Sequence, residues 1–137
     1  MNRRWLGKTG LLVSEIALGT WPFGGPTVLE GRQMGYGPIS EKEVRKIVCR
    51  SIELGINLID VADCYGAGKS EQLIGDILRE NGQDDIHIIT KVGVDYKNPN
   101  STIKRYDKQY VQKAIQESLK RLKRDVIDIY MLHSPST

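Results

Sequence analysis

The stretch NLIDVADCYGAGKSEQLIG, from Asn57 to Gly75, constrains the fold more than any other part of the chain. It opens with a short apolar run of the kind that forms a strand buried on both faces of a parallel sheet. Gly66 and Gly68 then mark a turn, and Ser70 is a candidate N-cap for a helix with apolar residues at helical spacing. A strand, a loop and a helix in this order are typical of an α/β protein with functional side chains at its strand ends.

The alternation of strand and helix continues on both sides of this stretch. Ser40 and Glu43 form a capping-box signature ahead of an apolar helical stripe, and a longer helix is expected over residues 108–121. Helical crossovers between strands imply parallel strands with right-handed connections. The sequence therefore predicts an α/β fold. The further strands that we expect are Glu15–Leu18, Ile86–Thr90 and Val126–Leu132.

The remaining segments are expected to be turns and loops. Arg4–Gly7 and Leu11–Ser14 flank a turn with Gly10, which predicts a small hairpin. The segment Pro22–Pro38 is rich in Gly and Pro and shows no periodicity, so we expect a long loop that acts as a lid or a binding loop. A second loop is expected over residues 92–106.

Composition narrows the class of protein. The length of 137 residues favours one domain, and a net charge of +3 is too small and too evenly spread to indicate a nucleic-acid partner. The cysteines Cys49 and Cys64 form neither a CxxC pair nor a disulfide framework. The N-terminus lacks the apolar region of a signal peptide and no run is long enough to span a membrane, so we expect a cytoplasmic protein.

Candidate catalytic residues share one position in the predicted fold. Asp60, Lys91 and His133 each stand at the carboxyl end of a predicted strand, and Tyr65 lies in the loop beyond Asp60. In a parallel barrel these strand ends form one rim, so the side chains should converge. Tyr65 could protonate a carbonyl oxygen if Lys91, held by Asp60, lowered the pKa of its phenol. Taken singly, each residue also has a structural reading as a packing, capping or solvated side chain.

Other motifs give weaker evidence of function. The letters GAGKS resemble a phosphate-binding loop, but Asp63 stands where the first Gly of that motif is required. His87 lies among isoleucines in a predicted strand and is expected to be structural. Cys64 has no base in the neighbouring sequence, and no spacing of His, Cys and carboxylates indicates a metal site.

Four motifs, in order, resemble the aldo-keto reductases: ALGTW, NLIDVADCYGAGKSEQLIG, IITKVG and DVIDIYMLHSP. The opening RRWLGKTGLLVSEIALGTW is similar to the branch that includes bacterial reductases and potassium-channel β subunits, and the likeness runs from about residue 3 to 136. The resemblance implies a catalytic tetrad of Asp60, Tyr65, Lys91 and His133, and none of its members is missing.

The resemblance also implies a reaction and its ligands. An aldehyde or ketone would be reduced to an alcohol, with a hydride from NADPH and a proton from Tyr65. Gly19, Thr20, Trp21 and Asp60 would contact the cofactor, and Trp21, Tyr65 and His133 the carbonyl substrate.

The family fold is a (β/α)8 barrel, which needs about 250 residues. The chain is therefore expected to hold only the N-terminal hairpin, four strands and three helices, so that residues 1–137 form the N-terminal half of a reductase domain whose C-terminal half is absent. Such a truncated chain is expected to be weak or inactive alone. Two alternatives remain: a non-catalytic regulatory or binding subunit, and a half-barrel without activity that associates through its open sheet edges.

Overall fold

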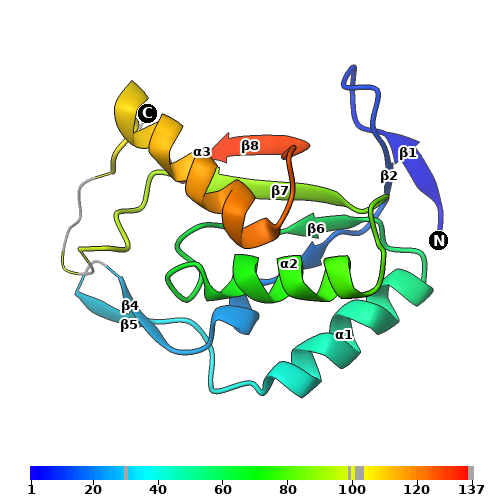
Figure 1. The fold of residues 1–137 in the computed structure, drawn as a ribbon, viewed down its shortest axis with the longest axis horizontal. Helices are drawn as coiled ribbons and strands as arrows, with labels where there is room; N and C mark the ends of the chain where they lie inside the picture. Colours follow the sequence, from blue (N-terminus) through cyan, green and yellow to red (C-terminus); the bar gives the residue numbers. More distant parts are fainter. Residues whose placement is uncertain (30, 99, 101–103, 136–137) are drawn as a thin grey trace.

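A computed structural model describes residues 1–29, 31–98, 100 and 104–135. Its centre is a parallel sheet, and helices cover one face of that sheet (Figure 1). The strands of the sheet are β3 (Leu18–Gly19), β6 (Leu58–Asp60), β7 (His87–Val92) and β8 (Ile129–Leu132). The helices of the described part are α1 (Glu41–Glu53), α2 (Lys69–Glu80) and α3 (Lys108–Leu122), together with the short 3₁₀ helix η1 (Trp21–Gly24).

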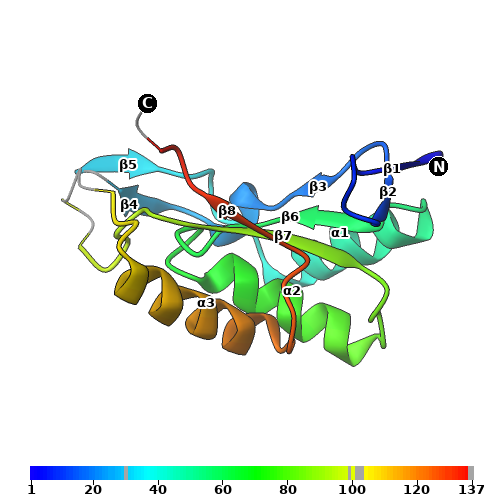
Figure 2. The ribbon, with the colours of Figure 1, turned by 90° about the horizontal axis from the view of Figure 1, so that it is seen from above.

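The strands follow the order β3-β6-β7-β8, so neighbours in sequence are neighbours in the sheet. Each pair is parallel, and Asp60 lies opposite Ile89 while Lys91 lies opposite Met131. Parallel neighbours require a crossover, and α1, α2 and α3 supply these crossovers on the same side (Figure 2). This confirms the predicted α/β fold. The strands begin or end one to three residues from the predicted limits.

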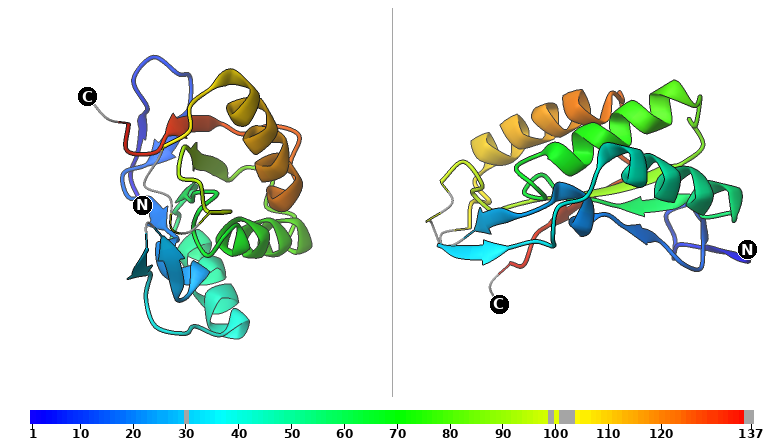
Figure 3. Two further views of the ribbon diagram at one scale, coloured as in Figure 1. Left: turned by 90° about the vertical axis from the view of Figure 1, so that its left-hand side faces the viewer. Right: turned by 90° about the horizontal axis from the view of Figure 1, so that it is seen from below.

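The other face of the sheet carries no helix in the part of the chain that the structure describes (Figure 3). Seen along the strands, the helices follow an arc around one side only. The outer strands β3 and β8 each pair with a single neighbour, so both edges of the sheet are open. The arrangement is that of a barrel wall that has not closed.

Two antiparallel hairpins lie at opposite ends of the sheet (Figure 2). The first, β1 (Arg3–Trp5) with β2 (Leu12–Ser14), confirms the predicted N-terminal hairpin. The second, β4 (Thr27–Leu29) with β5 (Arg32–Met34), falls inside the segment predicted as an irregular loop. That prediction is wrong for most of the segment, since η1 also reaches into it. In the second predicted loop, residues 99 and 101–103 lie outside the described residues, as does residue 136 near the chain end.

The caps of α1 and α2 differ from each other. Ser40 caps α1, and Glu43 returns the bond to the backbone of Ser40, so the predicted capping box is confirmed. Ser70 does not cap α2, because the N-cap is Gly68 with a left-handed φ of 92°. The Ser70 hydroxyl is fully buried and donates to the carbonyl of Thr20 at 3.0 Å. The residue predicted as a cap therefore ties α2 to the end of β3.

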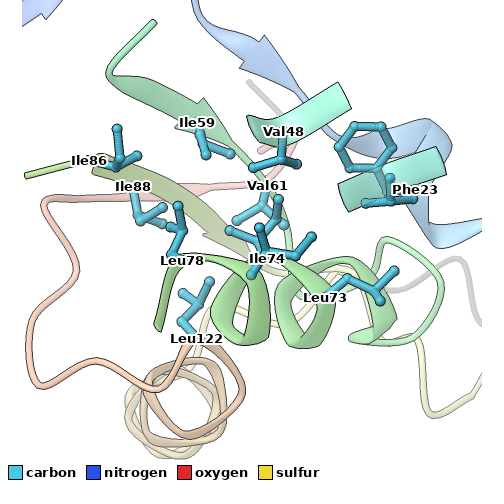
Figure 4. Packing of buried hydrophobic residues seen from close by; sticks show 12 residues of the cluster. Phe23, Val48, Ile59, Val61, Leu73, Ile74, Leu78, Ile86, Ile88 and Leu122 are labelled. Carbon is cyan, nitrogen blue, oxygen red and sulfur yellow. The ribbon is translucent and has the colours of Figure 1, made fainter. Parts of the chain in front are cut away.

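The core lies between the sheet and its helices (Figure 4). Ile59 and Ile88 of the sheet face Ile74 and Leu78 of α2, and all four are at most 3% exposed. Burial of a side chain of this size contributes about 1.5–3 kcal/mol, and the contact fixes the helices behind the strand ends. Among the helices of the described residues, none is long and apolar enough to cross a membrane.

Candidate active site

The carboxyl ends of the strands bring the predicted tetrad together. Asp60 is the last residue of β6, Lys91 lies in β7, and His133 directly follows β8. Tyr65 lies in the turn that leads to α2. The Lys91 ammonium donates to Asp60 Oδ1 at 2.7 Å, to the Val61 carbonyl at 2.9 Å and to the Tyr65 hydroxyl at 3.3 Å. One cation thus joins the carboxylate and the phenol.

Two aromatic rings pack against the Tyr65 ring. The His133 ring meets the Tyr65 ring edge-on, with centroids 5.9 Å apart. Trp21, from the start of η1, stacks on the other side at 6.2 Å and 27°, and Tyr36 packs edge-on against Trp21. Tyr65, Trp21 and His133 line a cavity of about 300 Å³ at this end of the sheet. The other lining residues are Arg32, Met34, Cys64, Val94, Lys104 and Ser134.

The pKa of Tyr65 differs from the expected direction. Lys91 lowers the pKa of this phenol, but burial raises it more, so the net pKa lies above the usual value. The expectation of a lowered pKa is therefore wrong: loss of water around the half-buried ring outweighs the nearby cation. A phenol with a raised pKa keeps its proton at neutral pH, as a proton donor must.

His133 is held on both sides of its backbone. Its N–H donates to the Val92 carbonyl at 2.8 Å, and its carbonyl accepts from the Tyr106 hydroxyl at 2.7 Å. Burial and the charges of Lys91 and Lys104 lower the pKa of the imidazole, so the ring is neutral at neutral pH. Its Nδ1 atom lies 3.5 Å from the Cys64 sulfur. The structure thus supplies a base-like neighbour for Cys64 that the local sequence did not show.

The predicted cofactor residues lie beside Asp60. Gly19 pairs with Asp60 across the sheet, and the N–H and hydroxyl of Thr20 both donate to the Asp60 carbonyl, at 3.0 and 2.9 Å. Thr20 is fully buried, backbone included, and its carbonyl accepts from the Ser70 hydroxyl, so in this structure it supports Asp60 from behind. Asp60 Oδ1 is held by Lys91, and Oδ2 makes no hydrogen bond to a described residue. Within the described ranges, no group of three or more His, Cys, Asp or Glu could hold a metal ion.

A buried charged network lies behind the site, and sequence reasoning missed it. Glu71 is fully buried, and its carboxylate accepts from the Thr90 hydroxyl at 2.6 Å and from Arg121 Nε at 2.7 Å. Asp63 is also fully buried, and neither of its carboxylate oxygens has a hydrogen-bond partner among the described residues. Burial and the charge of Glu71 raise the pKa of Asp63 to about 7. The sequence offered one signal for this network: both carboxylates stand next to residues that the structure buries.

The fold and the site define a class: a parallel α/β barrel wall with a Lys-centred set of polar residues at its carboxyl rim. The family model of the aldo/keto reductases matches residues 15–137, and the chain belongs to that family. The barrel fold and the family that the sequence predicted are confirmed. Four parallel strands, the hairpin and the three helices form part of the family's barrel.

Named relatives agree with this assignment. Aldo-keto reductase YhdN of Bacillus subtilis is 34% identical over 95% of this chain, and the uncharacterized oxidoreductase YqkF of the same organism is 35% identical over 97%. The holo form of aldo-keto reductase AKR11C1 from Bacillus halodurans is 33% identical and superposes with a TM-score of 0.79 over 99% of the chain. The glycerol dehydrogenase AKR11B4 from Gluconobacter oxydans is 30% identical and superposes with a TM-score of 0.71 over 98% of the chain.

The chain is much shorter than these relatives. The matches cover 37% of YhdN, 39% of YqkF, 41% of AKR11C1 and 39% of AKR11B4. The chain therefore spans less than half the length of each of these four relatives.

Proposed function

We propose that the chain carries the proton-transfer site of an NADPH-dependent carbonyl reductase and corresponds to the N-terminal half of the reductase domain. One observation carries the proposal: the Lys91 ammonium lies within hydrogen-bonding distance of both Asp60 and the Tyr65 hydroxyl. A phenol held by a cation that is itself fixed by a carboxylate is suited to give up a proton and to bear the negative charge that results. Reduction of an aldehyde or ketone to an alcohol needs such a group.

The residues beside the phenol suit the nicotinamide end of a dinucleotide. Asp60 Oδ2, which makes no hydrogen bond to a described residue, can accept one from a ribose hydroxyl, and Trp21 offers a flat wall to the cavity that Tyr65 lines. The backbone of Gly19 and Thr20 borders Asp60. When bound, the cofactor supplies the hydride. These residues would hold it, and the choice of NADPH over NADH rests on family membership.

The protein's own groups account for the proton. The Tyr65 O–H bond breaks as the carbonyl oxygen, which becomes negative when the carbon accepts a hydride, takes the proton. Lys91 stabilises the phenolate that remains, and Asp60 keeps the ammonium in place. His133 borders the same cavity and can donate a hydrogen bond to the carbonyl oxygen. The phenolate regains its proton from water.

Replacement of Tyr65 by Phe tests this proposal. The variant removes the proton donor and leaves the ring, so turnover should fall by about 10²–10⁴-fold, while NADPH affinity stays unchanged. The measurement is NADPH oxidation with an aldehyde, together with NADPH binding by fluorescence, in this chain and in any longer protein that contains it. Tyr36→Phe is the matched control, since Tyr36 packs on Trp21 without reaching Lys91. Undiminished turnover in the Tyr65 variant would falsify the assignment.

A second candidate rests on the open sheet. Met131 and Leu132 of β8 are 44% and 50% exposed, and among the described strands β8 pairs with β7 alone. A second copy related by an axis along the strands could place its β3 beside this β8 and close the barrel with strands that remain parallel. We propose such self-association for the 137-residue chain. Absence of carbonyl reduction in the associated form would favour a non-catalytic half-barrel over an enzyme.

A further inference from the structure

Among the described residues, Cys64 alone makes a hydrogen-bond contact with a ring nitrogen of His133. Its sulfur lies 3.5 Å from Nδ1, within the range of a hydrogen bond to sulfur. The thiol is 2% exposed, and it borders the same cavity as Tyr65 and His133. The contact joins a residue of the β6–α2 turn to the end of β8, which are 69 residues apart in sequence.

The electrostatic environment fixes the charge of both partners. Burial and the neighbouring Asp63 raise the pKa of the Cys64 thiol to about 12, so the thiol stays protonated. Burial and two lysines lower the pKa of His133, so the imidazole stays neutral. The contact is therefore between S–H and a neutral ring that carries one hydrogen.

The two neutral arrangements are unequal. In one, the S–H donates to a bare Nδ1; in the other, an Nδ1–H donates to sulfur. An imidazole nitrogen is a good acceptor, whereas thiol sulfur is a weak one. The first arrangement is favoured, and it leaves the ring hydrogen on Nε2. Within the part of the chain that the structure describes, Nε2 makes no hydrogen bond, so it is the nitrogen left to serve a ligand.

We propose that Cys64 is a positioning residue, whose S–H donates to Nδ1 of His133 and keeps the imidazole in the Nε2–H form. This inference builds on the proposed function, in which His133 donates to the carbonyl oxygen. With the other tautomer, Nε2 would present a lone pair to the lone pairs of that oxygen and repel it. Cys64 thus acts on the substrate only through the ring. Its thiol forms and breaks no covalent bond and stays reduced.

The test reads the tautomer directly by ¹⁵N NMR of the imidazole nitrogens in the 137-residue chain at neutral pH. The chain has two histidines, so their signals are easily assigned: the signals lost in His87→Gln belong to His87, and those that remain belong to His133. His87 holds Asp128 through Nδ1 at 2.9 Å and serves as the internal reference. We expect His133 to show a bare Nδ1 and a protonated Nε2. A protonated Nδ1 in the wild-type chain would overturn the inference without any variant.

Substitutions then separate positioning from packing. Cys64→Ala removes the donor, so the ratio of the two His133 tautomers should move toward Nδ1–H by roughly fivefold, the size of one neutral hydrogen bond, and the pKa of His133 should rise. Cys64→Ser keeps an O–H donor and should restore the Nε2–H form. Cys49→Ala, at the other cysteine, should change neither quantity. An unchanged tautomer ratio in Cys64→Ala, with the amide spectrum of a folded chain, would count against the inference.

This readout does not depend on turnover. An Nε2–H ring, found together with undiminished turnover in Tyr65→Phe, would support the role of Cys64 and overturn the proposed function. An Nδ1–H ring in a chain that reduces carbonyls would support the proposed function and overturn the role of Cys64.

Discussion

At the scale of single residues, Lys91 connects most of the site. Its position and those of Asp60 and His133 could be predicted, because each lies at the end of an apolar run and parallel strands end at one edge. Tyr65 follows in the loop beyond Asp60. The direction in which the Tyr65 pKa shifts could not be predicted, because it depends on how much water the neighbouring groups exclude. Sequence shows which charges are near but not how deeply a phenol is buried.

Loss of the Lys91 charge should act on both rate and pH dependence. In Lys91→Met the phenolate of Tyr65 loses its stabilising cation, so its pKa should rise further and carbonyl reduction should fall by about 10²-fold or more. Reduction needs the protonated phenol, so activity holds below the Tyr65 pKa and declines above it. The decline should therefore lie at higher pH in the variant than in the wild type. A pH–rate profile of NADPH oxidation checks this, with Lys91→Arg as the variant that keeps the charge. A decline at lower pH would contradict it.

The buried Asp63 should make stability depend on pH. In the folded chain its pKa is about 7, whereas an exposed Asp ionises near its usual value of about 3.9. Between these values the unfolded chain gives up the proton and the folded chain keeps it, so stability falls as pH rises.

Asp63→Asn removes the ionisable group, so it should stabilise the fold at pH 8 by about 2–4 kcal/mol, since each pH unit between the two pKa values costs about 1.4 kcal/mol, and should flatten the dependence between pH 4 and 7. Urea unfolding at several pH values measures both. Asp84→Asn, at an exposed position, is the control. Equal slopes for wild type and Asp63→Asn would refute the prediction.

At the scale of elements, the helices were easier to predict than the short strands. The capping box of α1 is a local pattern, and the apolar spacing of α2 matches its buried face. The β4–β5 hairpin was missed because the strands are three residues long and one face never reaches the core. The signal in the sequence was Gly31 in a two-residue turn between the strands, and the structure gives this Gly a positive φ of 70°. Ser70 failed as a cap because tertiary contact with Thr20 outweighed local preference.

The crossing of α2 and α3 depends on Gly75. A Cβ at this position would meet the Arg121 carbonyl and would lie 2.7 Å from the carbonyl carbon of Leu122, and this backbone cannot turn aside as a side chain can. Gly75→Ala should destabilise the fold by about 1–3 kcal/mol, despite the better helix propensity of Ala. Denaturant unfolding measures the loss. Gly37→Ala is the control, since its Cβ would have no atom within 4 Å. A neutral Gly75 variant would show that the helices can separate at little cost.

At the scale of the whole molecule, the described strands form a sheet with two open edges. The length of the family barrel allowed the half-barrel to be predicted, because four strands cannot close.

A charge on the open edge should weaken self-association. Leu132→Lys places an ammonium on the exposed edge strand, where a charge opposes strand pairing. If copies pair through β8, the dissociation constant should rise by about tenfold or more. Sedimentation over a range of protein concentrations measures this. Val126→Lys is the control, since Val126 is 69% exposed and precedes β8. A monomeric wild-type chain, or equal association of both variants, would exclude pairing through this edge.

The tetrad is spread over three adjacent strands and one turn, and this has a consequence for folding errors. Side chains alternate between the two faces of a strand, so a slip of β7 by one residue would turn Lys91 toward the helices and bring Thr90 or Val92 to the rim. Such a misfolded molecule could keep its helices, its compactness and its spectrum. The proposed proton transfer by Tyr65 would then report on strand alignment more sensitively than any bulk measure of folded structure.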